Sequence, residues 1–338
     1  MTARRAPTPT GKDAIDGTRV AWLRRLAEAP ETGVVVACVV VFVTLALVRS
    51  SFVSAVNLQG MGFDLAQYGL IAIGESLVIL TGGIDLSVGA LLGASVILMS
   101  WFNVRAGLSA GVAVLAILVI TGLIGLAHGL AVTRLDMPPF VVTLVTFTIA
   151  QGVTLVITSG TSIVGISDFF ATLGQTYLAQ IPVPLVLFAL VVLVARFFLE
   201  RTYVGRQVYA VGGNREAARL AGIRSNRRVV SMYVTCSLLS GFAGVLVLGR
   251  VGVGSASGIG VGWELTAVAA AIIGGVSLSG GQGRILGVLA GTVLLVLINN
   301  GLTTLQVNAN YTNIVLGCVL GLAITADRLR ARRVALRS

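Results

Sequence analysis

Long apolar stretches recur along this sequence and constrain its fold more than any other feature. An α-helix needs about 20 mostly apolar residues to cross the hydrocarbon core of a bilayer. Only 11% of the residues are charged, whereas a soluble domain carries about 25% charged residues. The sequence therefore predicts an all-α, polytopic integral membrane protein with about ten transmembrane helices, at residues 33–48, 65–81, 86–101, 107–131, 139–158, 181–198, 229–249, 264–279, 285–300 and 311–326.

The basic residues predict how the chain is oriented. Lysine and arginine are enriched in the cytoplasmic loops of membrane proteins. With a cytoplasmic N-terminus, 21 of the 24 Lys and Arg residues fall inside, and only Arg49, Arg105 and Arg250 fall outside. We therefore expect two cytoplasmic termini, with a basic tail at 1–32, a membrane domain at 33–326 and a second basic tail at 327–338. These charges flank apolar spans instead of covering one soluble surface, so lipid is the expected partner and nucleic acid is not.

Two glycine-rich octets, residues 82–89 and 274–281, are identical at five of eight positions. Both fall on the predicted cytoplasmic side, six spans apart, which indicates either a parallel internal repeat or a chance similarity between two membrane turns. We expect them to form structural corners in which Asp85 caps the next helix or contacts a partner or substrate. The motif residues are Gly82, Gly83, Asp85, Ser87, Gly89, Gly274, Gly275, Ser279 and Gly281.

The loop at 200–228 holds seven arginines and is the main polar feature of the predicted cytoplasmic side. Asn214 is a favourable N-cap, Glu216 suits the first turn of a helix, and Gly222 suits its end. A helix of about two turns is marginal by itself, so either a partner or the lipid headgroups should hold it. The candidate contact residues are Gly213, Asn214, Glu216, Ala217, Ala218, Leu220, Gly222 and Ile223.

Catalytic, nucleotide-binding and metal-binding patterns are not found in the sequence. The only lysine, Lys12, is followed by aspartate, whereas a phosphate-binding P-loop needs Ser or Thr after its lysine. The three cysteines lie in apolar stretches without a neighbouring ligand, as is typical of small buried residues. We therefore expect a protein that is not an enzyme and that binds no cofactor or metal of its own.

Polar residues inside the predicted spans are the candidates for a translocation path. Glu75 is the only acid well inside a span, where a charge usually faces a cavity or a partner; it either lines the path or packs between helices. Thr143, Gln151 and Thr154 share one face of the span at 139–158, so they either line a hydrated path or bond within and between helices. His128 has no acid three or four residues away, which favours a packing role.

Four motifs together carry a resemblance to a known family. They are TGGIDLSVG at 81–89, AVGGNREAARLAGI at 210–223, IIGGVSLSGGQGRILG at 272–287 and Asn299-Asn300-Gly301-Leu302. The second resembles the coupling helix of bacterial ABC-importer permeases, and the set is similar to the ribose/xylose/arabinose-type sugar permeases. The resemblance covers roughly residues 41–333. It adds Asn299 and Asn300 to the candidate path and makes 33–326 a transmembrane permease domain with a coupling loop at 200–228.

The resemblance also implies partners and a location. It implies a multi-pass subunit of the bacterial inner membrane that imports a monosaccharide or similar small polar solute. A separate cytoplasmic ABC ATPase would bind ATP and Mg²⁺, a second permease subunit would complete a homo- or heterodimer, and a periplasmic or lipid-anchored protein would deliver the solute. A branched-chain amino acid permease of the same superfamily and an ion-driven secondary transporter are the alternatives. The latter would need ion-coupling groups near the midplane of the membrane.

Overall fold

The computed structural model describes residues 32–255 and 258–308, together with residues 311, 314–315, 317–318, 321–322 and 325. The expected tail at 327–338 and nearly all of the tail at 1–32 lie outside the described residues. The same holds for half of the residues of the expected span at 311–326. The described chain is almost entirely helical, as the sequence predicts, with one two-stranded antiparallel sheet.

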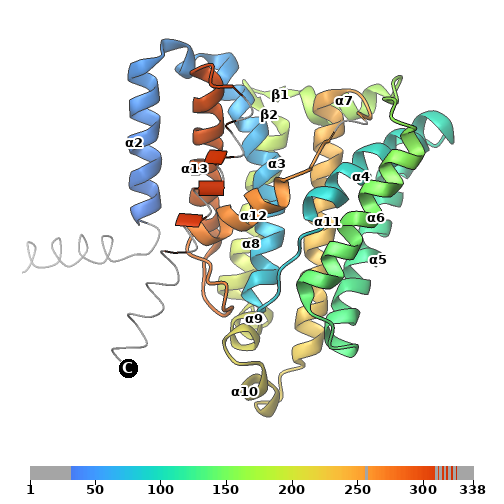
Figure 1. Cartoon of the computed structure of the whole chain (residues 1–338), viewed down its shortest axis with the longest axis vertical. Helices are drawn as coiled ribbons and strands as arrows, with labels where there is room; N and C mark the ends of the chain where they lie inside the picture. The colour runs from blue at the N-terminus through green and yellow to red at the C-terminus, as the bar shows by residue number, and fades with distance from the viewer. Residues whose placement is uncertain are drawn as a thin grey trace, which may run out of the picture.

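Most helices run side by side along the long axis of the molecule (Figure 1). The helices are α2 (Thr32–Val48), α3 (Ala55–Leu80), α4 (Val88–Ser100), α5 (Ala110–Arg134), α6 (Pro139–Thr158), α7 (Asp168–Gln175), α8 (Val183–Arg201), α9 (Tyr203–Gly213), α10 (Arg215–Leu220), α11 (Ser225–Val251), α12 (Trp263–Ile273) and α13 (Ile285–Thr304). A 3₁₀ turn (Ser50–Val53), a π-helical turn (Trp101–Arg105) and the strands β1 (Tyr177–Leu178) and β2 (Ile181–Pro182) complete the described elements.

Seven of the described helical segments are long and apolar enough to cross a membrane. They are α3, α5, α6, α8, α11, α13 and the segment 88–105, in which the π-helical turn extends α4. Helix α2 is a shorter apolar helix of 17 residues. The polytopic all-α class is therefore confirmed, whereas the count of ten spans and the cytoplasmic location of the termini stay predictions.

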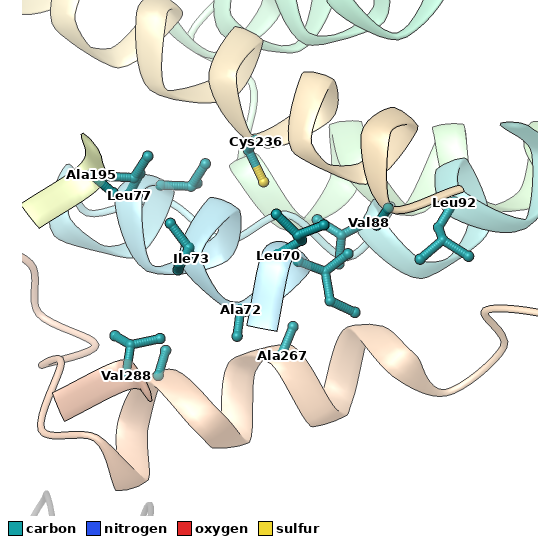
Figure 2. Close-up of a cluster of buried hydrophobic side chains, with 14 of the residues drawn as sticks. Leu70, Ala72, Ile73, Leu77, Val88, Leu92, Ala195, Cys236, Ala267 and Val288 are labelled. Atoms are coloured by element: carbon teal, nitrogen blue, oxygen red, sulfur yellow. The ribbon is translucent and has the colours of Figure 1, made fainter. Parts of the chain in front are cut away.

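Helices α3 and α11 form the centre of the bundle. Figure 2 shows α3 side chains, including Leu70 and Ile73, between Cys236 of α11 and Ala267 and Val288 of α12 and α13. Helix α5 comes very close to α11 because it presents glycine there. A Cβ on Gly125 would lie 2.5 Å from the backbone oxygen of Tyr233. Small residues allow such backbone contact between membrane helices.

The expected span at 264–279 is wrong in extent, because α12 ends at Ile273. Its 11 residues make a helix roughly 16 Å long, about half of the hydrocarbon thickness of roughly 30 Å. The apolar composition continues to Leu278, but the backbone does not continue the helix. Gly275 has a φ of +86°, a left-handed conformation that ends the helix and that glycine adopts at little cost.

The two glycine-rich octets lie together at the end of the bundle that carries α9. The backbone N–H of Gly281 donates to the carbonyl of Leu80, 3.0 Å away, which joins the second octet to the end of α3. The first octet leads from the long α3 to the short α4, whereas the second leads from the short α12 to the longer α13. Since the flanking helices occur in opposite order of length, the parallel repeat is not confirmed.

Candidate functional site

The first turns of α4 and α12 meet inside the helix bundle. A Cβ on Gly89 would lie 2.2 Å from the carbonyl oxygen of Gly260, and one on Gly93 would lie 2.2 Å from that of Ile259. Gly260 itself has a φ of +84°. Only glycine satisfies these distances, so the sequence allows two helix starts to touch backbone to backbone.

Each of these helix starts has its own buried carboxylate. Oδ1 of the fully buried Asp85 accepts hydrogen bonds from the backbone N of Ser87 at 2.9 Å and from its hydroxyl at 2.5 Å. Oε1 of the buried Glu264 accepts from the backbone N of Gly262 at 3.2 Å. Carboxylates are stabilised near helix N-termini by the helix dipole. Asp85 therefore closes a turn on Ser87 just before α4 without accepting from an N–H of the helix itself, so its role as a cap stays a prediction.

Glu75, Asp85, His128 and Tyr233 form a buried cluster between α3, α5, α11 and the first octet. Oε1 of Glu75 accepts from the backbone N of Asp85 at 3.1 Å, and Nδ1 of His128 lies 3.5 Å from Oδ2 of Asp85. The other ring nitrogen of His128 is 2.7 Å from the hydroxyl of Thr146. Because these residues come from different elements, a search for acids near His128 along its own helix missed this contact.

Two cavities flank the segment that precedes α12. The α4–α6 cavity, of about 170 Å³, includes Gln151, Thr154 and glycine and alanine residues of α4 in its lining. The α3–α13 cavity, of about 340 Å³, lies between α3, α12 and α13, and its lining residues are Asp64, Tyr68, Val261, Gly262, Trp263, Thr266, Val296, Asn299, Asn300 and Thr303. Val261 lines both cavities, so a single stretch of backbone separates them.

The residues proposed for a path fall in three places. Gln151 and Thr154 line the α4–α6 cavity, and Asn299 and Asn300 line the α3–α13 cavity. Glu75 and Thr143 line neither.

Some of these residues already make hydrogen bonds within the protein. Thr143 accepts a hydrogen bond from the backbone N of Leu86, which supports the first octet. Its hydroxyl also donates to the carbonyl of Pro139, and that of Thr154 donates to the carbonyl of Gln151, so both threonines bond to the backbone of their own helix. Asn300 exchanges two side-chain hydrogen bonds with Asn57, at 2.8 and 2.9 Å, which ties α13 to α3.

The expected short helix in the arginine-rich loop is α10. Oδ1 of Asn214 accepts from the backbone N of Ala217 at 2.9 Å, and Gly222 has a φ of +80°, as an N-cap and a C-terminal stop require. Ala217, Leu220 and Ala221 are exposed, with 76% of Leu220 accessible, whereas Ala218 is buried. The arrangement leaves a small apolar face uncovered within the described structure.

An exposed ion pair lies on α10. The guanidinium of Arg219 is 2.6 Å from Oε1 of Glu216, one turn away. This hydrogen bond and the positive charge of Arg219 hold the pKa of the Glu216 carboxyl below its usual value. Glu216 is therefore ionised at neutral pH and complements the N-terminus of the helix.

Helix α9, which the sequence did not predict, joins α10 to the end of α3 and to the second octet. A Cβ on Gly212 would lie 1.8 Å from the carbonyl oxygen of Leu80 and 2.5 Å from the backbone N of Gly281. The hydroxyl of Tyr209 donates to the carbonyl of Gly283 at 2.9 Å. The pair Gly212 and Gly213, directly before the cap residue Asn214, was the available sequence signal for a close backbone contact. The segments that Gly212 contacts lie far away in the sequence and could not be identified from it.

Comparison with known proteins decides the family. The model of the branched-chain amino acid transport system permease component matches residues 57–324, which is most of the chain. The chain belongs to this family of permeases. The match covers both octets, α9, α10 and both cavities of the permease.

Several curated relatives of the permease are named for sugars. It is 37% identical over 294 residues to the ribose import permease protein of Bacillus subtilis strain 168, with 86% of this chain and 91% of the relative covered. It is 36% identical over 260 residues to the D-allose transport system permease protein of Escherichia coli K12, covering 77% and 79%. It is 31% identical over 304 residues to the L-arabinose ABC transporter permease protein of Azospirillum brasilense, covering 88% of each. No solved structure matches the permease significantly.

Proposed function

We propose that the permease is the membrane-spanning subunit of an ATP-binding-cassette importer for a monosaccharide or a similar small polar solute. It is a multi-pass protein of the bacterial inner membrane. The observation that carries the proposal is the similarity over nearly the whole chain to permeases named for ribose, allose and arabinose. The family model alone, which is described by branched-chain amino acids, would leave the solute class open.

The charges near the two cavities favour an uncharged solute over an amino acid. A free amino acid carries a carboxylate that needs a cation or an open helix N-terminus. An acidic side chain lies beside each of the helix starts of α4 and α12, Asp85 at the first and Glu264 at the second, and would oppose a bound carboxylate. The residues that line the two cavities include no lysine or arginine. A sugar, which presents only hydroxyls, needs neither kind of positive site.

The exposed face of α10 supports coupling to a separate ATPase. A cytoplasmic ATPase that holds ATP and Mg²⁺ would cover Ala217, Leu220 and Ala221, which no described residue covers. The seven arginines of the loop at 200–228 support a cytoplasmic position for α10 under the positive-inside rule. A second permease subunit and an external solute-binding protein complete the proposed importer.

Reconstitution in liposomes tests the proposal directly. The permease is combined with its partner ATPase and binding protein, and uptake of labelled ribose, allose, galactose, arabinose and leucine is measured with and without ATP. We expect ATP-dependent uptake of at least one sugar and none of leucine. Uptake of leucine instead would support the amino acid alternative. Uptake driven by an ion gradient without the ATPase would contradict the importer.

A further inference from the structure

The α3–α13 cavity has the size and position of a small-molecule site. Its volume of about 340 Å³ falls in the range of about 300–1,000 Å³ that ligand pockets occupy. Asp64 and Tyr68 lie in the first half of α3, and Asn299 and Thr303 lie near the end of α13. The cavity therefore lies toward the end of the bundle opposite α9 and α10, where a solute delivered from outside would arrive.

One wall of the cavity is aromatic. The rings of Tyr68 and Trp263 lie 4.6 Å apart between centroids and are inclined by 51°. Both residues line the cavity and are half-buried. Aromatic rings offer a broad apolar surface with little conformational freedom to lose. The C–H face of a furanose or pyranose ring matches such a surface.

The α13 side of the cavity supplies hydrogen-bonding groups. Asn299 lines the cavity, and its Oδ1 is buried without a hydrogen-bond partner among the described residues. Its neighbour Asn300 is already paired with Asn57. A buried polar atom without a partner is destabilising unless a ligand or water satisfies it. Asn299 therefore has hydrogen-bonding capacity that the described protein does not use.

The charges at the rim of the cavity cancel. The guanidinium of Arg250 pairs with the carboxylate of Asp64 and lies over the ring of Phe63, 4.9 Å from its centroid. This pair holds the carboxylate at the rim, where it can accept hydrogen bonds from hydroxyls. The remaining lining residues are neutral. A neutral, hydroxyl-rich ligand with one apolar face fits this arrangement.

We propose that the α3–α13 cavity is a monosaccharide-binding site of the permease itself, with Tyr68 and Trp263 against the face of the sugar ring and Asp64 and Asn299 on its hydroxyls. The inference rests on the proposed function and adds the place where the solute binds. It places Trp263 in contact with the sugar, so the fluorescence of this tryptophan should change when the sugar binds. It also separates the two neighbouring asparagines, because Asn299 binds the solute whereas Asn300 joins two helices.

Fluorescence of the full-length permease tests this site without its partners. Replacing the other tryptophans by Trp22→Phe and Trp101→Phe leaves Trp263 as the only reporter. Purified protein in lipid nanodiscs is titrated with ribose, allose, galactose and arabinose. We expect a saturable change in emission with at least one sugar. Asn299→Ala should raise the apparent Kd for that sugar about tenfold. Thr148→Ala, at an exposed position of α6 that lines neither cavity, is the control and should leave the Kd unchanged.

Further measurements distinguish a loss of binding from misfolding, and an error in the proposed site from an error in the proposed function. Thr303→Val keeps the shape of the side chain and should also weaken binding, with the thermal unfolding midpoint unchanged. If none of the four sugars changes the emission although the whole importer transports one of them, the site is wrong and the proposed function stands. A saturable response to leucine in place of the sugars would overturn the sugar assignment of the cavity. Equal uptake by Asn299→Ala and unmodified importer at limiting sugar would overturn it as well.

Discussion

The backbone N–H of Asp85 donates a hydrogen bond to Oε1 of Glu75 across 3.1 Å, and both side chains are fully buried. Since Glu75 lies more than a turn before the end of α3, this bond folds the segment after α3 back along the helix. Helix α4 consequently starts inside the bundle instead of at its end. Glu75 thus positions the helix start that contacts Gly260.

The first prediction separates a structural role of Glu75 from a role in the path. Glu75→Gln keeps an oxygen at the same place and should leave thermal stability nearly unchanged. Glu75→Ala leaves the N–H of Asp85 unpaired and should cost about 1–3 kcal/mol, a typical value for a buried donor that loses its partner. Thermal unfolding in detergent measures both. A stable Glu75→Gln variant without sugar uptake would instead place Glu75 in the path.

The second prediction concerns the contact between His128 and Asp85, whose nearest atoms lie 3.5 Å apart. Because they share one buried cluster, the effects of His128→Ala and Asp85→Asn on stability should not add. We expect an interaction energy of about 0.5–3 kcal/mol in a double-mutant cycle. The pair His128 and Gln151, which lie in separate sites, provides the control cycle and should be additive.

The third prediction uses two adjacent glycines as a matched pair. Gly212→Ala places a Cβ 1.8 Å from the carbonyl oxygen of Leu80, whereas a Cβ on Gly213 meets no atom within 4 Å. Overpacking of this kind typically costs about 1–3 kcal/mol. Gly212→Ala should therefore lower the unfolding midpoint, and Gly213→Ala should leave it unchanged. Equal effects of the two substitutions would contradict the packing of α9 on the octets.

The fourth prediction tests the exposed face of α10. Leu220→Glu changes a side chain that is 76% exposed, so the stability of the isolated permease should not change. Binding of the ATPase should fall by about tenfold or more, because a charge replaces an apolar anchor at an interface. Co-purification and uptake measure the effect. Leu178→Glu, an exposed leucine of β1 outside the arginine-rich loop, is the control and should bind the ATPase normally.

Local patterns predicted those parts of the molecule that depend on neighbours in sequence. The apolar runs located most helices, and Asn214 and Gly222 marked the ends of α10, because caps and apolar periodicity act within one or two turns. The length of α12 was not predicted, because its apolar composition continues past the point where the conformation of Gly275 ends the helix.

The candidate sites were harder to predict because they depend on packing between distant segments. Glu75 was singled out, but its contact with Asp85 and the approach of His128 bring together three separate elements. Asn299 and Asn300 are equivalent in the sequence. They differ by about 100° around α13, so only Asn300 reaches Asn57 while Asn299 keeps an unpartnered oxygen.

The contact of Gly212 with Leu80 and Gly281 determines how stiffly α9 is joined to the bundle. These three residues meet through backbone atoms, so no side-chain rotamer is available to absorb a shift of the helix. A displacement of α9 toward the bundle by a bound partner would therefore press directly on the end of α3 and on the octet after α12. Helix α9 is therefore joined to the end of α3 and to the segment between α12 and α13 by a connection of low compliance.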